Sequence, residues 1–187
     1  MNSFTDIILI AFCFILAGYA GSKIYLLRPA IKLSEQQLAR LLALARQSLE
    51  SLDVPVGALL LYQNEIIGEG CNTVLLASDA GGHAEINAIS GAIHRLGMEQ
   101  FSALDRASLI LFTTFEPCLM CTGAFINYNI KNVYFLKEKD TLYLTKEALR
   151  FVRYYVRRGK MHHAGEQDAL FEQHPRYPLR KENFSSE

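Results

Sequence analysis

Two short motifs hold the residues of this chain that are best suited to chemistry. His83-Ala84-Glu85 supplies an imidazole and a carboxylate two positions apart, and Pro117-Cys118-Leu119-Met120-Cys121 supplies two thiols three positions apart. Cysteines at positions i and i+3 share one face of a helical turn. One histidine and two cysteines suit zinc, and three protein ligands leave a coordination position for water, which is typical of a catalytic zinc site.

Each half of this pattern is weak evidence by itself. A lone C-x-x-C is often a redox pair, and a lone H-x-E usually has no function. In this order, however, the two motifs match the H-x-E and P-C-x-x-C signature of the zinc deaminases. The expected ligands are His83, Cys118 and Cys121, and Glu85 would then be a carboxylate beside the metal that is free to move protons.

The sequence resembles the cytidine and deoxycytidylate deaminase superfamily, and within it the branch of tRNA adenosine deaminases and free-base deaminases. The blocks that carry the resemblance span roughly Ser34 to Leu136 and are Val54-Pro55-Val56-Gly57-Ala58, Gly68-Glu69-Gly70-Cys71-Asn72 and Glu116-Pro117-Cys118-Leu119-Met120-Cys121-Thr122-Gly123-Ala124. The resemblance implies an α/β fold, namely a three-layer α/β/α sandwich with a mixed central sheet. It also implies one zinc ion per chain and a homodimer.

The resemblance further implies roles for individual residues. Glu85 would be the catalytic proton shuttle, Asn72 would contact the substrate base or sugar, and Val56 would lie in the substrate site. Backbone groups of Ala84 and around Glu116 would position the exocyclic amine. The implied reaction is hydrolytic: a water activated at zinc attacks the amino-bearing carbon of adenine or cytosine, and ammonia leaves. By itself, Asn72 would also suit a turn after a strand.

Three functions remain open at this level. The first is adenosine-to-inosine deamination in tRNA, and the second is deamination of a free base or nucleoside of the cytosine or guanine type. The third is a catalytically inactive, zinc-stabilised interaction module, against which the intact Glu85 argues. With 19 basic and 19 acidic residues, the formal net charge is +0 and gives no overall attraction to nucleic acid, which favours a small substrate. The separation of His83 and Cys118 is longer than is usual in this branch, and the loop before His83 lacks the usual proline.

The elements expected around these motifs alternate between strands and helices, which predicts a mixed or parallel sheet covered on both faces. Ser34 and Gln37 form a capping-box pattern at the start of a helix. The expected buried face of that helix is Leu38, Leu41, Leu42, Ala45 and Leu49. The expected strands are Val54–Tyr62, Ile66–Gly70, Ser108–Thr114 and Asn132–Leu136, and the first two are joined by an expected turn at Gln63-Asn64-Glu65. Helices are expected to begin at the two motifs.

The two ends of the chain carry different signals. An uninterrupted apolar run from Ile7 to Gly21 predicts a membrane-spanning helix if its neighbours join it, and the cations that follow place the catalytic part in the cytoplasm. A cleaved signal peptide and a buried or partner-binding helix are the alternatives. Near the other end, the pattern of Thr145–Arg158 predicts an amphipathic helix. Its arginines either contact RNA phosphates or form the solvent-exposed face of a helix that packs on the domain. The predicted organisation is a membrane anchor (1–27), a linker (28–33), the deaminase domain (34–158) and a polar, irregular tail (159–187).

Overall fold

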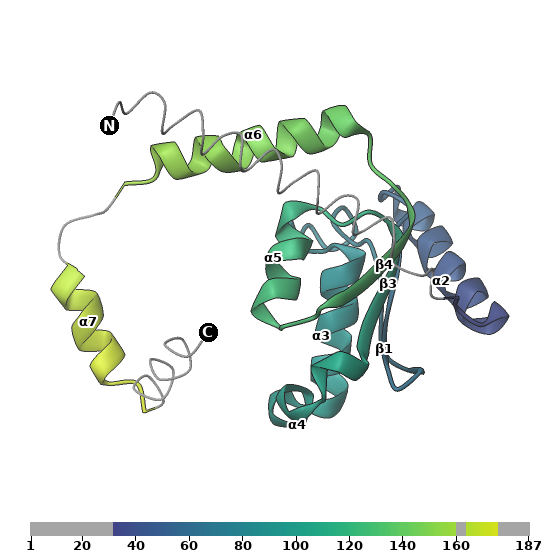
Figure 1. Cartoon of the computed structure of the whole chain (residues 1–187), viewed down its shortest axis with the longest axis horizontal. Coiled ribbons are helices and arrows are strands. Elements are labelled where there is room, and N and C mark those ends of the chain that lie inside the picture. Colours follow the sequence, from purple (N-terminus) through teal and green to yellow (C-terminus); the bar gives the residue numbers. More distant parts are fainter. Residues whose placement is uncertain (1–31, 160–163, 176–187) are drawn as a thin grey trace, which may run out of the picture. The chain divides into compact units, whose positions relative to one another are not determined.

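The computed structural model describes residues 32–159 and 164–175 and divides the chain into two compact units, the first ending at Glu138 and the second beginning at Lys139 (Figure 1). The predicted deaminase domain, 34–158, therefore contains parts of both units. The predicted membrane anchor, 1–27, lies outside the described residues. No helix in the described part of the chain has the length and apolar character needed to cross a bilayer.

The first unit is built on a mixed four-stranded sheet with the order β2-β1-β3-β4. The strands are β1 (Gly57–Tyr62), β2 (Glu65–Cys71), β3 (Leu109–Phe115) and β4 (Asn132–Lys137). β1 runs antiparallel to β2 and β3, and β3 runs parallel to β4. The predicted mixed sheet is confirmed.

The first strand begins later than predicted. Val54 and Pro55 are exposed and precede β1, because Val56 donates its N–H to Val54 O at 2.7 Å in a tight turn and Pro55 has no N–H to give to a neighbouring strand. After β1, Gln63 and Asn64 make the predicted turn, with φ angles of 50° and 71°. Positive φ at both central residues is the geometry of a tight hairpin turn.

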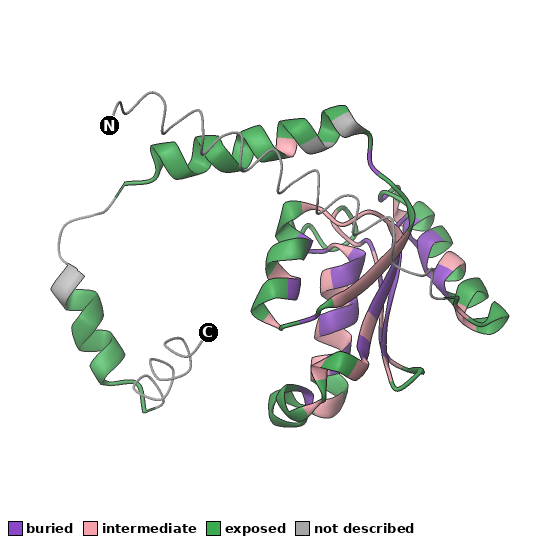
Figure 2. Cartoon of the chain, viewed as in Figure 1, coloured by how far each residue is buried: buried purple, intermediate pink, exposed green. Residues whose placement is uncertain are grey.

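Helices cover both faces of the sheet (Figure 1). α2 (Glu35–Gln47) lies on one face, and α3 (Ala84–Leu96) and α5 (Leu119–Asn127) lie on the other. Alternate residues of β1 serve the two faces. Leu59 and Leu61 pack with α2, whereas Ala58 and Leu60 join the larger cluster formed with α3 and α5. The buried residues gather in the sheet and in the inner faces of these helices (Figure 2).

The predicted capping box of α2 is confirmed, since Gln37 N donates to Ser34 Oγ at 3.2 Å and Ser34 N donates to Gln37 Oε1 at 2.9 Å. The predicted buried face is partly wrong. Leu38 and Leu49 are 37% and 53% exposed. The α-helix ends at Gln47 and continues as the short 3-10 helix η1 (Ser48–Ser51), which takes Leu49 off the α-helical face. The buried face consists instead of Leu41, Leu44, Ala45 and Ser48.

Two glycines of β2 allow α3 to press against the sheet. A Cβ atom on Gly68 would lie 2.1 Å from Ala88 O, and one on Gly70 would lie 2.1 Å from Ala84 O. No side chain fits there, so glycine at these two positions sets the distance between β2 and the helix that begins at the H-x-E motif.

Two further short elements connect α3 to β3: α4 (Met98–Ala103) and the 3-10 helix η2 (Arg106–Ser108). The second unit contains α6 (Thr141–Arg157) and α7 (Ala164–Glu172). α6 begins four residues before the predicted start, because the carboxylate of Asp140 caps it and accepts from Leu142 N at 3.0 Å. The tail was predicted to be irregular, which is wrong for the residues of α7.

Candidate active site

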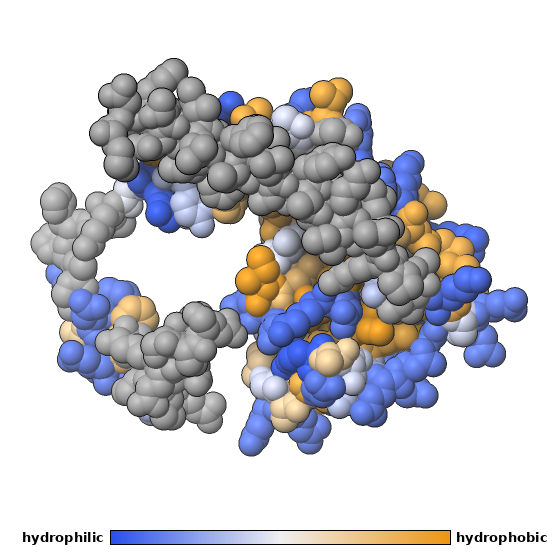
Figure 3. Space-filling model, viewed as in Figure 1, coloured by the Kyte–Doolittle hydropathy of each residue, from blue (hydrophilic) through white to orange (hydrophobic). Residues whose placement is uncertain are grey.

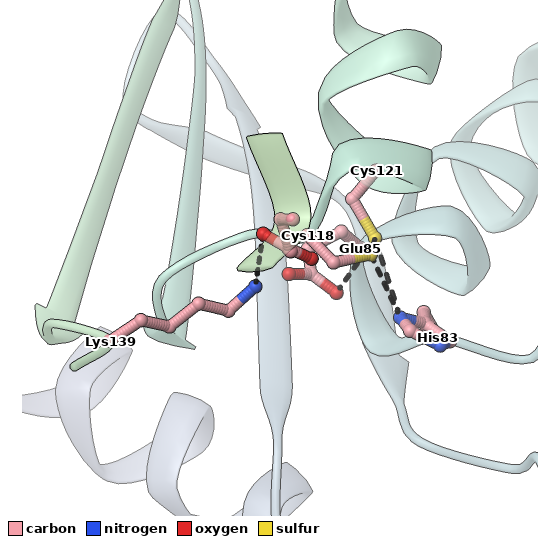
Figure 4. A network of polar contacts seen from close by, with 6 residues as sticks. His83, Glu85, Cys118, Cys121 and Lys139 are labelled. Carbon is pink, nitrogen blue, oxygen red and sulfur yellow. Dashed lines mark hydrogen bonds and ion pairs between the residues drawn. The ribbon is translucent and has the colours of Figure 1, made fainter. Parts of the chain in front are cut away.

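His83, Cys118 and Cys121 converge from two helix starts, as the two motifs predicted (Figure 4). His83 is the N-cap residue of α3, with an extended backbone (φ −77°, ψ 146°), and Cys118 is the N-cap residue of α5. In a regular helix, residues 83 and 85 would point about 200° apart. The extended cap removes that restriction, so His83 and Glu85 reach the same site.

The spacing of the three ligand atoms fits a zinc ion. His83 Nδ1 lies 3.6 Å from Cys118 Sγ and 3.5 Å from Cys121 Sγ, and the two sulfurs are 3.6 Å apart. Tetrahedral zinc with ordinary Zn–S and Zn–N bonds requires about 3.8 Å between two sulfurs and about 3.6 Å between sulfur and nitrogen. Among the described residues, these three form the one group of side chains close enough to hold a metal ion.

The two ligand thiols lie within hydrogen-bonding distance of each other, and this contact shifts their pKa values in opposite directions. Their mutual hydrogen bond lowers the pKa of the Cys118 thiol to about 5, and the same hydrogen bond raises the pKa of Cys121. Cys118 is therefore the more easily ionised thiol of the two. A thiolate is the form of cysteine that binds metal, so the lowered pKa of Cys118 favours metal binding.

Glu85 is buried next to the ligands, 3% exposed, with Oε2 3.5 Å from Cys121 Sγ (Figure 4). Burial raises the pKa of its carboxyl group. A carboxyl with a raised pKa accepts and returns protons at neutral pH more readily than an exposed one. This arrangement can support proton transfer at a group bound in the remaining metal position.

Asn72 follows β2 and is buried. Its side-chain Oδ1 accepts from Ala84 N at 2.9 Å, so Asn72 holds the start of α3. The backbone N–H of Ala84, expected to position a substrate amine, is used by this bond. Within the described residues, the amide NH₂ of Asn72 makes no hydrogen bond, which leaves its donors available to a bound molecule.

Val56 and Glu116, the other residues expected to contact substrate, differ in their burial. Val56 is buried in the same apolar cluster as Ala84 and Cys121. Glu116 is half-buried between β3 and α5, and its backbone N–H donates to Lys137 O at 2.9 Å. That bond extends the β3–β4 pairing beyond the end of the sheet.

Ser48 and Asp53 are positioning residues that the sequence reasoning missed. Ser48 Oγ donates to Val56 O at 3.2 Å and accepts from Asn72 N at 3.0 Å. The carboxylate of Asp53 accepts from Leu75 N at 2.8 Å and Leu76 N at 3.2 Å, which holds the loop leading to His83. No local pattern identifies either residue, because the partners named here lie 8 to 24 residues away in the chain.

Residues 32–137 match the family model of the cytidine and deoxycytidylate deaminase zinc-binding region. Together with the fold and the ligand set, this match over more than half of the chain shows that the chain belongs to this zinc-binding deaminase family.

Among curated proteins, the chain is similar to the tRNA-specific adenosine deaminase of Buchnera aphidicola subsp. Schizaphis graminum (strain Sg). The two are 38% identical over 86 residues, which cover 46% of this chain and 54% of the relative. The chain spans about half the length of the curated relatives it matches.

Two solved structures are also similar. A structure from a study of A-to-I editing by tRNA:A34 deaminases aligns with a TM-score of 0.50 at 31% identity, over 57% of this chain and 79% of that one. Guanine deaminase from Bacillus subtilis aligns with a TM-score of 0.52 at 28% identity, over 69% of this chain and 80% of that one.

Proposed function

We propose that this chain is a zinc-dependent hydrolytic deaminase that converts an amino-substituted nucleobase to its oxo form and releases ammonia. The best candidate substrate is adenosine in tRNA, which becomes inosine. The observation that carries the proposal is the buried carboxylate of Glu85 beside a three-ligand site. A purely structural zinc site is closed by four protein ligands and has no use for such a group.

The chain's own residues supply binding and proton transfer. His83, Cys118 and Cys121 would hold the ion, which when bound makes water nucleophilic at neutral pH. Glu85 accepts a proton from the attacking water at its carboxylate and delivers it to the ring nitrogen. A further transfer through Glu85 protonates the departing amine, so water and an amino-base become an oxo-base and ammonia. The free amide donors of Asn72 would orient the base.

A free base of the guanine type is the second candidate. The guanine deaminase structure aligns with a larger part of this chain than the tRNA deaminase structure does. The formal net charge of +0 gives no overall attraction to a polyanion. tRNA is favoured because several curated relatives, from different organisms, are tRNA-specific adenosine deaminases.

The deciding experiment measures ammonia release by the full chain with tRNA, adenosine, guanine and cytosine offered separately. We expect turnover on tRNA, and a loss of at least 10²-fold in Glu85→Gln, since general acid–base catalysis is worth about that much or more. Glu99→Gln, on the exposed surface of α4, is the matched control and should keep full activity. Turnover on guanine alone would select the second candidate, and wild-type activity of Glu85→Gln would refute the mechanism.

We also propose that the chain forms a homodimer, as the family resemblance implied. The outward surface of α5 exposes Leu119, Met120 and Ile126, which are 44%, 42% and 76% accessible. Figure 3 shows hydrophobic residues on the surface over α5. Association through such a patch would bury apolar area beside both metal sites. Light scattering of the full chain, compared with Ile126→Asp, measures the oligomeric state.

For residues 1–27 we propose a membrane anchor, with the catalytic domain on the cytoplasmic side. The support is the apolar run Ile7–Gly21 followed by Lys23, Arg28 and Lys32. Resistance of the full chain to alkaline extraction from membranes tests this, and Leu16→Arg should release it into the supernatant. Extraction of the wild-type chain would refute the anchor.

A further inference from the structure

α6 is divided lengthwise into an apolar and a basic half. Successive residues of a helix are rotated by about 100°. One half of α6, which we call the apolar face, contains Leu142, Leu149, Phe151, Val152, Tyr155 and Val156. The opposite half, which we call the basic face, contains Lys146, Arg150, Arg153 and Arg157. All of these side chains are exposed, and Figure 2 shows α6 exposed along nearly its whole length.

The positive charge on the basic face is not neutralised within the helix. Glu147 is the only acidic residue in the sequence from Thr141 to Arg158, and it pairs with Lys139 at 3.5 Å. Within the described residues, none of the arginines on the basic face forms an ion pair. They line, together with Tyr154 and Arg158, a shallow cavity of about 390 Å³. The cavity is suited to a phosphate group, because guanidinium groups donate paired hydrogen bonds to phosphate oxygens.

We propose that α6 is a membrane-surface helix that binds an anionic phospholipid bilayer. The apolar face enters the boundary between headgroups and acyl chains, and the arginines contact the headgroup phosphates. A helix with one apolar half, one strongly cationic half and aromatic residues among the apolar ones is the type that lies in this interface. At a rise of about 1.5 Å per residue, its 17 residues form a rod of about 25 Å lying along the surface.

The bilayer is preferred because it satisfies both halves of α6 at once. RNA would neutralise the arginines but leave six large apolar side chains in water. A second copy of the chain could cover the apolar face but would leave the positive charge without a partner. An anionic membrane surface attracts each nearby arginine or lysine by about 1 kcal/mol and also takes up the apolar side chains.

The aromatic residues of α6 fit the same orientation. The rings of Phe151 and Tyr155 are 4.7 Å apart, and the guanidinium of Arg158 lies over the Tyr155 ring at 4.4 Å. Tyrosine and arginine both place an apolar part in the lipid and a polar tip at the headgroups. This inference is independent of the proposed reaction and of the proposed anchor in residues 1–27.

A tryptophan probe tests the proposal cleanly, because the sequence contains no tryptophan. The full chain carrying Val152→Trp, on the apolar face, is reconstituted with phosphatidylcholine vesicles or with vesicles that also contain phosphatidylserine. The matched control is Tyr154→Trp, about 200° away on the helix among the arginines that face the headgroups, and so outside the acyl-chain region that brominated lipids report on. Both variants keep residues 1–27 and every charge, so attachment through the N-terminal segment affects them equally.

We expect the Val152→Trp emission to shift to shorter wavelength, and to be quenched by lipids brominated on their acyl chains, only in vesicles that contain phosphatidylserine. Tyr154→Trp should respond weakly. Adding Arg150→Gln, Arg153→Gln and Arg157→Gln should weaken the surface-binding equilibrium about 5-fold for each arginine removed, from about 1 kcal/mol per cation.

Three results would overturn the proposal. One is emission from Val152→Trp that is already at short wavelength without lipid and does not change, because protein would then cover the apolar face. Another is an equal response to neutral and anionic vesicles, because the arginines would then play no part. The third is the absence of any response to vesicles together with quenching of Tyr154→Trp by tRNA.

Discussion

At the residue scale, the site combines three metal-ligating side chains, a buried carboxylate and residues that hold them. Glu85 is separated from His83 by one residue, yet both face one site because His83 lies in an extended cap. The Asn72 side chain has two polar groups with different uses. Its oxygen accepts from the first N–H of α3, and its NH₂ group remains available to a bound molecule. The backbone of Asn72 depends in turn on the buried hydroxyl of Ser48.

Ser48→Ala should impair substrate binding more than chemistry. The substitution removes one of the two acceptors of Asn72 N and a donor to Val56 O, both in a buried setting. We expect a loss of about 1 kcal/mol in unfolding free energy, a raised KM and a nearly unchanged kcat. Steady-state kinetics together with thermal unfolding measure these effects. Ser102→Ala, exposed on α4, is the control, and a fall in kcat at unchanged KM would contradict the positioning role.

At the scale of the elements, the site depends on how closely α3 approaches β2 and on the loop that leads into α3. Gly70 meets α3 at the residue next to His83. The loop from Thr73 to Gly82 is closed by a hydrogen bond from Thr73 N to Gly82 O at 2.8 Å, and Asp53 holds it from outside. A change in either contact would move the His83 imidazole relative to the Cys118 and Cys121 thiols.

Gly70→Ala should therefore lower both stability and zinc affinity. Its Cβ would lie 2.1 Å from Ala84 O and 2.6 Å from Ala88 N, both backbone atoms that cannot rotate away. Overpacking of this kind costs about 1–3 kcal/mol or more. The matched control is Gly123→Ala in α5, where the added Cβ meets no atom of the described residues within 4 Å. That variant should be unchanged or more stable by about 0.5–1 kcal/mol. Thermal unfolding and zinc titration compare the two.

Asp53→Asn should change how stability depends on pH. Burial by itself raises the pKa of Asp53, but hydrogen bonds from Leu75 N, Ser51 Oγ and Leu76 N outweigh it and hold the pKa below its usual value. A lowered folded-state pKa stabilises the fold above the ordinary pKa of aspartate, about 3.9, and this contribution is lost as the pH falls through the folded-state value.

The variant should thus be less stable than the wild-type chain at neutral pH, and the difference should shrink below about pH 4. Denaturant unfolding of both proteins at a series of pH values measures this difference in stability. All other carboxylates are the same in the two proteins, so their contributions to the pH dependence cancel. A difference that stays constant from neutral to acidic pH would show that Asp53 does not act through its charge.

At the scale of the whole molecule, the zinc site joins the two helices that cover one face of the sheet. Ligand binding to the folded state alone stabilises it, by about 4 kcal/mol when zinc is present at 1,000 times its Kd. Chelation should lower the Tm of the full chain, and added zinc should restore it. Cys121→Ser should abolish this response and activity together, whereas Cys71→Ser should keep both. An unchanged Tm on chelation of the wild-type chain would contradict metal binding across α3 and α5.

The ligand set, the neighbouring carboxylate and the alternation of strands and helices could all be predicted from the amino-acid sequence, because they depend on residue type and short spacing. The capping box at Ser34 and the hairpin turn at Gln63 and Asn64 are local in the same sense. The buried face of α2 was only partly predicted, since the switch to a 3-10 helix at Ser48 is not visible in the apolar periodicity.

Three features could not be predicted before the chain was seen folded: Asn72 holds Ala84, Ser48 and Asp53 support the site and its loop, and Gly70 sets the approach of α3. They depend on contacts between residues twelve or more positions apart in the chain. Such pairs meet only once the sheet and helices have packed, whereas the charges and apolar residues of α6 were already ordered by a single helical period.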